Sequence, residues 1–559
     1  MENYSKIVDY VVVGAGTAGC VIANRLSEDS DCAVLLLEAG GRDWHPMLRM
    51  PVAFVRAIQS PGVNWGFRSE PEPHLNGRVI EVPRGKVLGG SSSVNGMFHI
   101  RGHRRDFDSW LDLGCEGWGY ADVLPYFKRY ETSWRGAGEY HGAEGPLAVR
   151  AIDTRKLVAE PLKQAMAAAG YALTDDYEGE QQEGFGCGEV TIDGRGRRAS
   201  TARAYLHPLR RRANLVVETR ALTTRILIEN GRAVGVEYLR GGRRYRVRAQ
   251  REVVIAGGTY NSPQLLMLSG IGPADELRKL GILPKIDLPG VGANLIEHPR
   301  MPMNFLATQD VTFARELRFD RAVVSVLRWA LLGDGPFATQ ICSGTLLMRS
   351  RPEVDRPDIQ LLCNPVSLDA RLWFPGVVAP RPHSFYVTLC MIHQRSRGRV
   401  SLRSANPADA PRIFLNLFSD PEDFATMRRG IEATRAIYRT QPQAALVGRE
   451  TLPGDGVISE KDLNAAIAAH VGITHHPVGT CKMGVDEQAV VDPQLRVHGV
   501  AGLRVADASV MPTIPGANTM AAAIMIGEKA ADLIRGRRLA PEHREAGVAG
   551  AGTGMLSRG

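Results

Sequence analysis

The apolar positions of the first forty residues predict a strand–helix–strand unit. The run Asp9-Tyr-Val-Val-Val13 is typical of a parallel strand that is buried on both faces. Residues 20–26 place apolar side chains at helical spacing, and residues 33–38 form a second apolar run. The turn Gly14-Ala-Gly-Thr-Ala-Gly19 joins the first strand to the helix. This order is one βαβ unit.

The pattern of residues 214–256 predicts a β-meander. Apolar segments flank Asn230-Gly231, a dipeptide that favours a tight hairpin because both of its residues tolerate positive φ. A further strand, residues 252–256, leads through Gly257-Gly258 into a helix. We expect that helix to begin at Ser262-Pro263, with proline in the first helical position.

From about residue 300 to 465 the chain changes character. Alternating segments at 385–389 and 399–402 predict strands, and residues 420–438 predict a helix. A second domain is therefore expected to begin near Pro299. Residues 536–559 are rich in glycine, alanine and arginine and lack periodicity, so we expect a disordered tail.

Composition excludes several classes of protein. With 44% hydrophobic residues and a formal charge of +8 from 68 basic and 60 acidic residues, the 559-residue chain is expected to fold. Its arginines are scattered and seldom alternate with aromatic residues, which argues against nucleic acid as a partner. No run of ~18 apolar residues predicts a membrane span, and peripheral membrane contact stays open.

The cysteines and histidines give no metal motif. No Cys-x-x-Cys pair occurs among the eight cysteines, which we interpret as reduced thiols of a cytoplasmic protein. The absence of an apolar signal core at the start favours the same location. His99 and His103 are separated by Ile-Arg-Gly, which disfavours a helical pair of ligands, and we see no carboxylate that completes a set. We therefore predict no metal.

The glycine-rich turn has the spacing of a dinucleotide-binding loop. Gly14 permits a tight turn, Gly16 allows backbone to approach a pyrophosphate, and Gly19 lets helix and strand pack closely. The amino terminus of the helix offers free N–H groups to phosphates. Glu38, at the end of the second strand, is placed to bind ribose hydroxyls. A purely structural turn is the alternative, and the motif does not choose between FAD and NAD.

A second loop, Pro83-Arg-Gly-Lys-Val-Leu-Gly-Gly-Ser-Ser-Ser-Val-Asn-Gly96, concentrates small residues and hydrogen-bonding side chains. Small residues let backbone approach a planar ligand, while serine and asparagine supply directional hydrogen bonds. An ordinary surface loop is the alternative. We favour a planar ligand because Gly-Gly and three serines occur together after an apolar strand end.

At this point the sequence resembles the glucose–methanol–choline (GMC) flavoprotein oxidoreductases. The closest likeness is to the bacterial choline-dehydrogenase-like branch, which contains many alcohol dehydrogenases that do not use choline. The likeness lies in five segments in family order: the βαβ unit with Glu38; residues 83–96; Gly258-Thr-Tyr-Asn-Ser-Pro-Gln-Leu-Leu-Met-Leu-Ser-Gly-Ile-Gly272; Pro289-Gly-Val-Gly-Ala-Asn-Leu-Ile-Glu-His-Pro299; and Thr474-His-His-Pro-Val-Gly-Thr-Cys-Lys-Met-Gly484 through Met520.

The resemblance implies FAD rather than NAD, and an α/β fold with two domains. A doubly wound, Rossmann-type FAD domain is expected from the non-contiguous residues 1–155, 195–299 and 466–535. A substrate domain built on an antiparallel sheet is expected from residues 156–194 and 300–465.

The family's cofactor contacts, carried over position by position, fall in four regions of this chain. Val217 is expected beside the adenine, and Asp507 with Ala508 near the pyrophosphate and ribityl chain. The residues implied to bind FAD are Gly14, Gly16, Thr17, Ala18, Gly19, Glu38, Ala39, Arg84, Val87, Gly89, Gly90, Ser91, Asn95, Gly96, Val217, Asp507, Ala508, Asn518 and Thr519.

Three positions depart from the family pattern. Some relatives attach FAD covalently through a histidine where this chain has Val94, so we expect non-covalent FAD. Glu297 stands where the family often has aspartate, and His475 stands where an aromatic residue is common. The change at His475 is close to the expected active site. It makes the substrate harder to infer from the family, but it does not affect the expected type of reaction.

The expected catalytic pair is His476 and Asn518. An alcohol gives hydride to flavin N5 only if its hydroxyl proton leaves to a nearby base, and histidine has a suitable pKa. His476 precedes a proline in the family's catalytic position, and Asn518 matches the second position, where it would hydrogen-bond the substrate oxygen. Structural roles are the alternatives: a satisfied histidine, and a helix N-cap at Asn518 or Thr519. The helix that follows is expected to direct its positive end at the flavin.

The function expected from the resemblance is FAD-dependent oxidation of an alcohol, taken to be primary, to an aldehyde or ketone. The alternative is a non-alcohol member of the same fold, a hydroxynitrile lyase or a light-driven fatty-acid decarboxylase. A nicotinamide-dependent dehydrogenase leaves residues 83–96 and 474–520 unexplained. The identity of the small-molecule alcohol, the electron acceptor (oxygen, a quinone or another) and the oligomeric state are not predicted.

Overall fold

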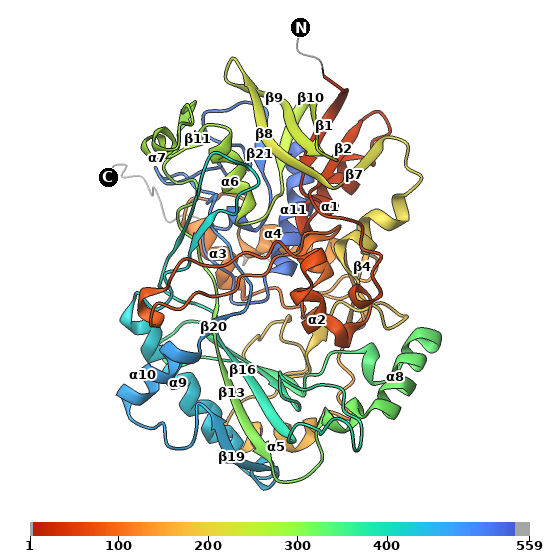
Figure 1. Ribbon diagram of the computed structural model, residues 1–559, viewed down its shortest axis with the longest axis vertical. Coiled ribbons are helices and arrows are strands. Elements are labelled where there is room, and N and C mark those ends of the chain that lie inside the picture. Colours follow the sequence, from red (N-terminus) through yellow and green to blue (C-terminus); the bar gives the residue numbers. More distant parts are fainter. Residues whose placement is uncertain (1–3, 543–559) are drawn as a thin grey trace, which may run out of the picture.

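Two β-sheets, one above the other in Figure 1, organise the chain. The structure is a computed structural model and describes residues 4–542. The upper sheet has the strand order β7-β2-β1-β10-β9-β8, and β21 pairs with β10. Its strands are β1 (Lys6–Val13), β2 (Val34–Glu38), β7 (Leu215–Thr219), β8 (Ala221–Glu229), β9 (Arg232–Arg240), β10 (Arg243–Ile255) and β21 (Leu503–Val505).

The parallel part of this sheet confirms the predicted βαβ unit. β7, β2, β1, β10 and β21 run parallel, and helix α1 (Thr17–Leu26) connects β1 to β2. Residues 10–13 are buried, as expected of a strand covered on both faces. α1 packs against α11 (Met520–Ile534), so a helix from the start of the sequence and one from residues 520–534 lie side by side next to the sheet (Figure 1).

The β-meander is also confirmed. β8 and β9 pair antiparallel, and β9 pairs with the first half of β10. The turn between β8 and β9 has positive φ at both Asn230 (47°) and Gly231 (74°). Pro263 differs from the expectation, because helix α6 begins one residue earlier (Asn261–Leu268) and places the proline third.

The lower sheet is antiparallel, with the order β19-β13-β16-β15-β14-β5 and with β20 pairing with β13. Its two faces differ. Met301, Leu389 and Leu361 are cross-strand neighbours on the face that packs against α9 (Pro421–Tyr438), whereas the opposite face carries polar residues. The strands are β5 (Gly184–Gly186), β13 (Pro299–Ala307), β14 (Gly344–Met348), β15 (Ile359–Asn364), β16 (Ser384–Met391), β19 (Val447–Leu452) and β20 (Gly472–Ile473).

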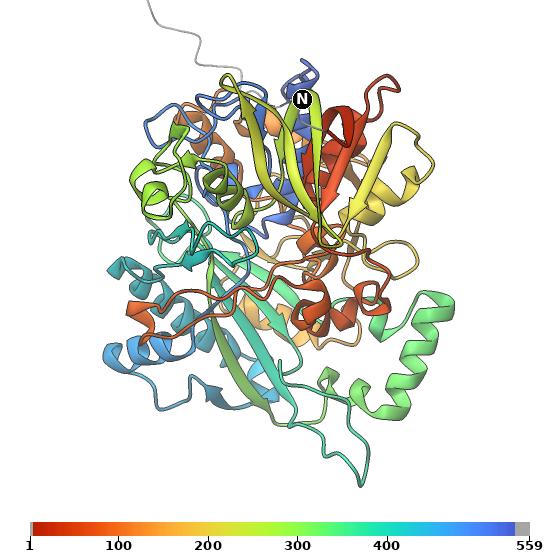
Figure 2. The ribbon, with the colours of Figure 1, turned by 45° about the horizontal axis from the view of Figure 1, so that its top comes forward.

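The remaining helices surround the two sheets, and Figure 2 shows α8 projecting at one side of the lower sheet. These helices are α2 (Phe54–Gln59), α3 (Arg104–Asp112), α4 (Tyr120–Tyr130), α5 (Ala159–Ala168), α7 (Ala274–Lys279), α8 (Phe319–Leu332) and α10 (Glu460–His470). Within residues 4–542, none of the helices combines the length and apolarity needed to span a bilayer.

The expected disordered tail is wrong for its first residues. Residues 537–542 follow α4: Leu539 N donates to Tyr126 OH at 3.1 Å, and Glu542 N donates to Ala121 O at 2.9 Å. The rest of the predicted tail, residues 543–559, lies outside the described residues.

Sheet membership supports the two-domain division made from the sequence. β5, from residues 156–194, joins the lower sheet, while β21, from residues 466–535, joins the upper one; the two-residue strand β20, also from 466–535, pairs with β13 of the lower sheet and is the exception. We propose that residues 1–155, 195–299 and 466–535 form one domain and that residues 156–194 and 300–465 form the other.

Gly19 provides a test of how tightly the βαβ unit is packed. A Cβ at this position would lie 1.9 Å from the carbonyl oxygen of Gly14, so the backbone must move to accept it. We expect Gly19→Ala to destabilise the protein by about 1–3 kcal/mol, measured by thermal unfolding. Gly62→Ala is the control, because its Cβ meets no atom within 4 Å. Equal melting temperatures for both variants would contradict the close packing.

Candidate active site

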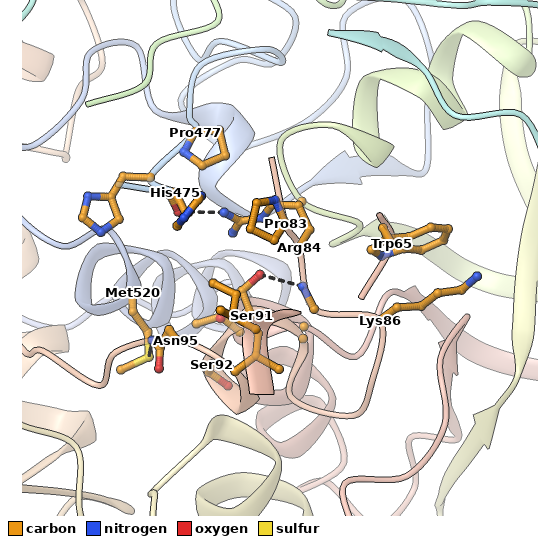
Figure 3. A pocket seen from close by; sticks show the side chains of 18 of the residues that line it. Trp65, Pro83, Arg84, Lys86, Ser91, Ser92, Asn95, His475, Pro477 and Met520 are labelled. Carbon is orange, nitrogen blue, oxygen red and sulfur yellow. Dashed lines mark hydrogen bonds between the residues drawn. The ribbon is translucent and has the colours of Figure 1, made fainter. Parts of the chain in front are cut away.

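A cavity of about 940 Å³ lies between the two sheets. Its lining comes from the β1–α1 turn, the end of β2, residues 83–98, the amino end of α6, the polar face of β13, β15 and β16, and residues 473–477, 507–508 and 518–523. Figure 3 shows side chains from residues 83–95, 475–477 and Met520 converging on this space. Loops from both ends of the sequence therefore build one site.

The end of the cavity beside the upper sheet suits a dinucleotide. α1 begins there without a side-chain cap, so its first N–H groups face the cavity, where they can bind phosphates. Glu38 accepts hydrogen bonds from Ala15 N at 2.9 Å and from Gly40 N at 2.8 Å. Burial raises the pKa of Glu38 to about 7, although these two bonds oppose the shift. A carboxylate has further acceptor sites for ribose hydroxyls.

The loop of residues 83–96 approaches this end closely. At Gly90, whose φ is +53°, a Cβ would lie 2.7 Å from the Cα of Gly16. Arg84 Nη1 donates to His475 O at 2.7 Å, which ties the loop to residues 474–477, the segment expected to be catalytic (Figure 3). Within the loop, Gly85 N donates to Ser91 Oγ at 3.2 Å. Such close backbone approach fits a flat ligand, and the isoalloxazine of FAD is one.

Most residues that the sequence predicted for the cofactor line the cavity. These are Gly14, Gly16, Thr17, Ala18, Glu38, Ala39, Arg84, Gly90, Ser91, Asn95, Gly96, Asp507, Ala508, Asn518 and Thr519. Asp507 does so while accepting from Gly258 N at 2.9 Å and from Ser262 Oγ at 2.6 Å. His476 lines the same cavity.

Four predicted residues are not in the lining. Gly19 packs against Gly14, Gly89 N donates to Ala15 O at 2.8 Å, and Val87 is buried beside Gly41. These three hold the turns in place behind the cavity surface. Val217 is in the middle of β7, paired with β2, and the cavity is instead lined by Ala221, Leu222 and Thr223 at the start of β8. Val217 therefore stays a prediction as the residue beside the adenine, and Leu222 is the large apolar side chain of this region that lines the cavity.

His476 has hydrogen-bond contacts on both ring nitrogens. Its Nδ1 lies 3.1 Å from His298 Nδ1 and 3.0 Å from Thr474 Oγ1, while its Nε2 lies 3.1 Å from Asn518 Nδ2. His298 Nε2 lies 3.0 Å from Ile392 O. This network determines which nitrogen of His476 carries the proton.

The Ile392 carbonyl can only accept, so His298 donates from Nε2 and, as a neutral ring, accepts at Nδ1. Independently, the Thr474 hydroxyl donates to His298 O at 3.1 Å, so its oxygen also accepts from His476. Both neighbours thus require an N–H at Nδ1 of His476. We assign the lone pair to Nε2, which is the nitrogen on the side of Asn518.

The charge state of the site follows from its burial. The pKa of His476 is held well below its usual range, mainly by burial and to a smaller extent by the nearby His298 and Arg84. Burial, followed by His393, lowers the pKa of His298 to about 3. Both rings are therefore neutral at physiological pH, which the assignment requires.

Asn518 is directed at His476 rather than at the helix that follows. Its Nδ2 meets His476 Nε2, and its Oδ1 is buried without a hydrogen-bond partner among the described residues. The structural alternative, a side-chain cap, is not found: Thr519 occupies the N-cap position of α11 without a capping hydrogen bond. The amino terminus of α11 is consequently free to direct positive potential into the cavity.

Glu297 and His475, two of the three departures from the family pattern, both lie at this segment. Glu297 Oε1 accepts from His476 N at 2.6 Å, and burial raises the pKa of the Glu297 carboxyl to about 8. His475 has a φ of 64° and lines the cavity beside His476. His298 and Thr474 were missed, although both lie in segments that the sequence singled out.

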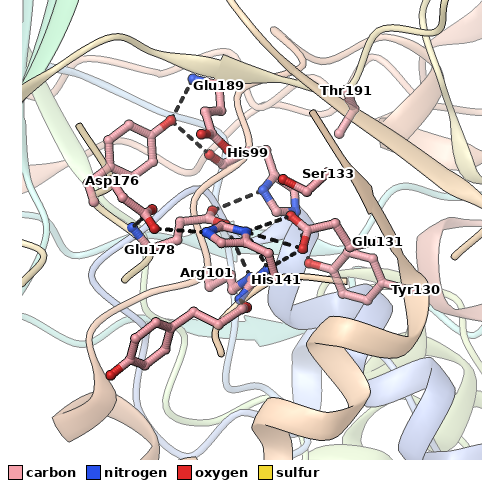
Figure 4. Close-up of polar contacts among 12 residues, drawn as sticks. His99, Arg101, Tyr130, Glu131, Ser133, His141, Asp176, Glu178, Glu189 and Thr191 are labelled. Atoms are coloured by element: carbon pink, nitrogen blue, oxygen red, sulfur yellow. Dashed lines mark hydrogen bonds and ion pairs between the residues drawn. The ribbon is translucent and has the colours of Figure 1, made fainter. Parts of the chain in front are cut away.

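A second polar cluster lies outside the cavity (Figure 4). Arg101 contacts Glu131 at 2.5 Å and Glu178 at 3.1 Å, and His99 contacts Glu178 at 2.9 Å. The argument that no carboxylate completes a ligand set is wrong, because the possible ligand atoms of His99, Glu178 and Glu189 all lie within 4.8 Å of one another. Arg101 nevertheless pairs with two of the cluster's carboxylates, which makes the cluster an ion-pair network.

The site and the fold define an FAD-dependent oxidoreductase. The chain belongs to the GMC oxidoreductase family, whose models match residues 8–300 and 394–527. It is 44% identical over 532 residues to an oxygen-dependent choline dehydrogenase of Rhizobium etli, covering 95% of this chain and 96% of that protein.

Solved structures agree with this assignment. Pyridoxine 4-oxidase from Mesorbium loti superposes with a TM-score of 0.85 at 30% identity, covering 95% of this chain and all of the other. A formate oxidase variant of Aspergillus oryzae RIB40 superposes with a TM-score of 0.88 at 26% identity, covering 96% and 99%.

The ion-pair network of Figure 4 predicts a pH dependence of stability. Burial opposes protonation of His141, but hydrogen bonds to Asp176 and Glu131 raise its pKa to about 9. The stabilisation is fully present below the unfolded pKa of about 6.5 and is lost as pH rises through 9. We expect wild type to exceed His141→Gln in unfolding free energy by about 3 kcal/mol at pH 6 and by little at pH 10. A difference that does not change with pH would contradict the protonated histidine.

Proposed function

We propose that this protein oxidises an alcohol to a carbonyl compound, with His476 as the base and Asn518 as the hydrogen-bond partner of the substrate oxygen. The observation that supports this most directly is the lone pair of His476 Nε2 in the lining of the cavity, which accepts from Asn518 Nδ2 while Asn518 Oδ1 is buried and, among the described residues, unpartnered. Removing a hydroxyl proton requires an unprotonated nitrogen of this kind. Bound FAD supplies the acceptor for the hydride.

The chain's own residues prepare the site before substrate binds. His298 and Thr474 hold the proton of His476 on Nδ1, so that Nε2 accepts the hydroxyl proton. Glu297 fixes the backbone of His476, and Arg84 fixes that of His475. Groups that are already oriented need no reorganisation during the reaction.

The cofactor is proposed to be non-covalent. Val94 lines the cavity where some relatives have the histidine that attaches FAD, and a valine side chain offers no nucleophile. FAD is then retained by the α1 amino terminus, Glu38 and the loop of residues 83–96.

The other functions considered are less well supported. The relatives and solved structures described above are named as dehydrogenases and oxidases, which does not favour a lyase or a decarboxylase. We propose oxygen as the electron acceptor, since the Rhizobium etli relative is named oxygen-dependent. A cytoplasmic location is proposed on the eight cysteines, all of which are free thiols.

Replacing the base gives the direct test. We expect His476→Ala to bind FAD but to lower the rate of flavin bleaching by a panel of alcohols about 10²–10⁴-fold under anaerobic conditions. His470→Ala, at the exposed end of α10, is the control and keeps the wild-type rate. A fast His476→Ala variant would exclude this residue as the base.

The positioning role of His298 has its own test. His298→Leu removes one of the two acceptors of the His476 proton, so we expect kcat to fall about tenfold with little change in KM. His298→Asn retains a carbonyl acceptor and should recover part of the loss. If kcat is the same in His298→Leu and wild type, with equal FAD content, the tautomer does not depend on His298.

A further inference from the structure

The polar face of the lower sheet contributes a cation to the cavity. Arg300 on β13 lies opposite Cys390 on β16, which in turn lies opposite Gln360 on β15, and all three line the cavity. Arg300 follows His298 by two residues, and its strand pairs with Gly472–Ile473, just before the catalytic segment. Its guanidinium therefore belongs to the wall where a substrate binds.

Two hydrogen bonds fix the Arg300 guanidinium. Nε donates to Ile473 O at 2.8 Å, and Nη1 donates to Tyr386 OH at 3.0 Å. Within residues 4–542, Nη2 has no hydrogen-bond acceptor and no carboxylate forms an ion pair with this arginine. The side chain is half-buried. A fixed guanidinium whose charge is unpaired and whose Nη2 can still donate is suited to an oxyanion.

The carboxylates that line the cavity are engaged elsewhere. Glu38 and Asp507 hold backbone N–H groups at the dinucleotide end. Asp369 pairs with Arg381 at 3.0 Å, and Asp409 accepts from Ser404 Oγ at 2.5 Å. None of these four carboxylates forms an ion pair with Arg300.

The aromatic residues that cluster in the lining are packed on one another, since Phe67 contacts both Trp65 and Tyr260, and a lysine already occupies one of their faces. Trp65 stacks on Phe67, and the Lys86 ammonium already lies 4.4 Å from the Trp65 ring centroid. Phe98 and Phe54 lie close to Gly96, at 3.5 Å and 3.7 Å from a Cβ built there, and they provide an apolar wall. A quaternary ammonium is recognised by several aromatic faces or by an acid.

We propose that the substrate is an alcohol that carries a carboxylate, and that Arg300 is the specificity-determining residue that binds this carboxylate. The inference rests on the proposed function and narrows it, and it separates this chain from the choline dehydrogenases that it resembles. A fixed positive charge in choline would face Arg300 and the nearby Arg84 across a cavity with no free acid.

The reaction leaves the carboxylate unchanged. The hydroxyl proton passes to His476 Nε2, the C–H bond is broken, and its electron pair leaves with hydrogen as hydride to the bound FAD. The carbinol carbon is oxidised to a carbonyl. Arg300 acts only on binding and orientation.

Two sets of matched alcohols separate charge from shape. The aliphatic set is 4-hydroxybutanoate, 3,3-dimethylbutan-1-ol and choline; the aromatic set is 4-(hydroxymethyl)benzoate, 4-methylbenzyl alcohol and [4-(hydroxymethyl)benzyl]trimethylammonium. Anaerobic flavin bleaching gives kcat/KM for each with the holoenzyme. We expect the carboxylate to exceed the neutral alcohol by about 10–100-fold in at least one set, and the ammonium compound to be slowest in both.

Variants of Arg300 connect the preference to this residue. Arg300→Gln should abolish the preference for the carboxylate, Arg300→Lys should retain part of it, and Arg300→Glu should favour the ammonium compound. Binding of 4-methylbenzoate, which has no hydroxyl, is measured from the flavin spectrum and should weaken about 10–100-fold in Arg300→Gln. This measurement does not depend on turnover.

The outcomes distinguish the two proposals. If no alcohol in either set bleaches the flavin, the proposed function fails. If neutral or cationic alcohols react as well as carboxylates, or if Arg300→Gln slows all members of a set equally, the function stands and the role of Arg300 is overturned. If Arg300→Glu does not fold, wild type, Arg300→Gln and Arg300→Lys still decide the question.

Discussion

A buried chain of hydrogen bonds that starts at one backbone carbonyl determines the chemistry of the site. Ile392 O accepts from His298 Nε2, so His298 accepts at Nδ1 and His476 must donate from Nδ1. Because burial keeps both rings neutral, Nε2 of His476 holds a lone pair before any substrate arrives. The proposed base is thus prepared by the fold and not by the substrate.

The two sheets contribute different parts of this arrangement. The upper, largely parallel sheet presents the α1 amino terminus and Glu38, which suit a dinucleotide, and the amino terminus of α11 opens onto the same cavity. The lower, antiparallel sheet supplies Arg300, and His298 immediately precedes its strand β13. Residues 474–477 follow β20, which pairs with β13. The same strand pairing therefore positions the proposed base, His476, and the cavity-lining Arg300.

Local signals predicted the fold well because they reflect local physics. The glycine turn, the apolar runs and Asn230-Gly231 each specify their own backbone, and the structure confirms all three. Such signals do not predict contacts between distant segments. Nothing in the sequence pairs His298 with His476. Nor does it show that the start of β8, with Leu222, lines the cavity while Val217 in β7 does not. Glu178 likewise joins His99 only through the fold. The alternative of a helix cap at Asn518 or Thr519 is also not found, since Asn518 bonds His476 and Thr519 makes no capping hydrogen bond.

The position of one hydrogen atom tests the central claim most directly. Neutron diffraction from deuterated crystals of the FAD-loaded protein can locate deuterium on each imidazole nitrogen. The account predicts deuterium on Nδ1 of His476 and on Nε2 of His298, with none on Nε2 of His476. Deuterium on Nε2 of His476 would remove the base from the substrate side and would contradict the account.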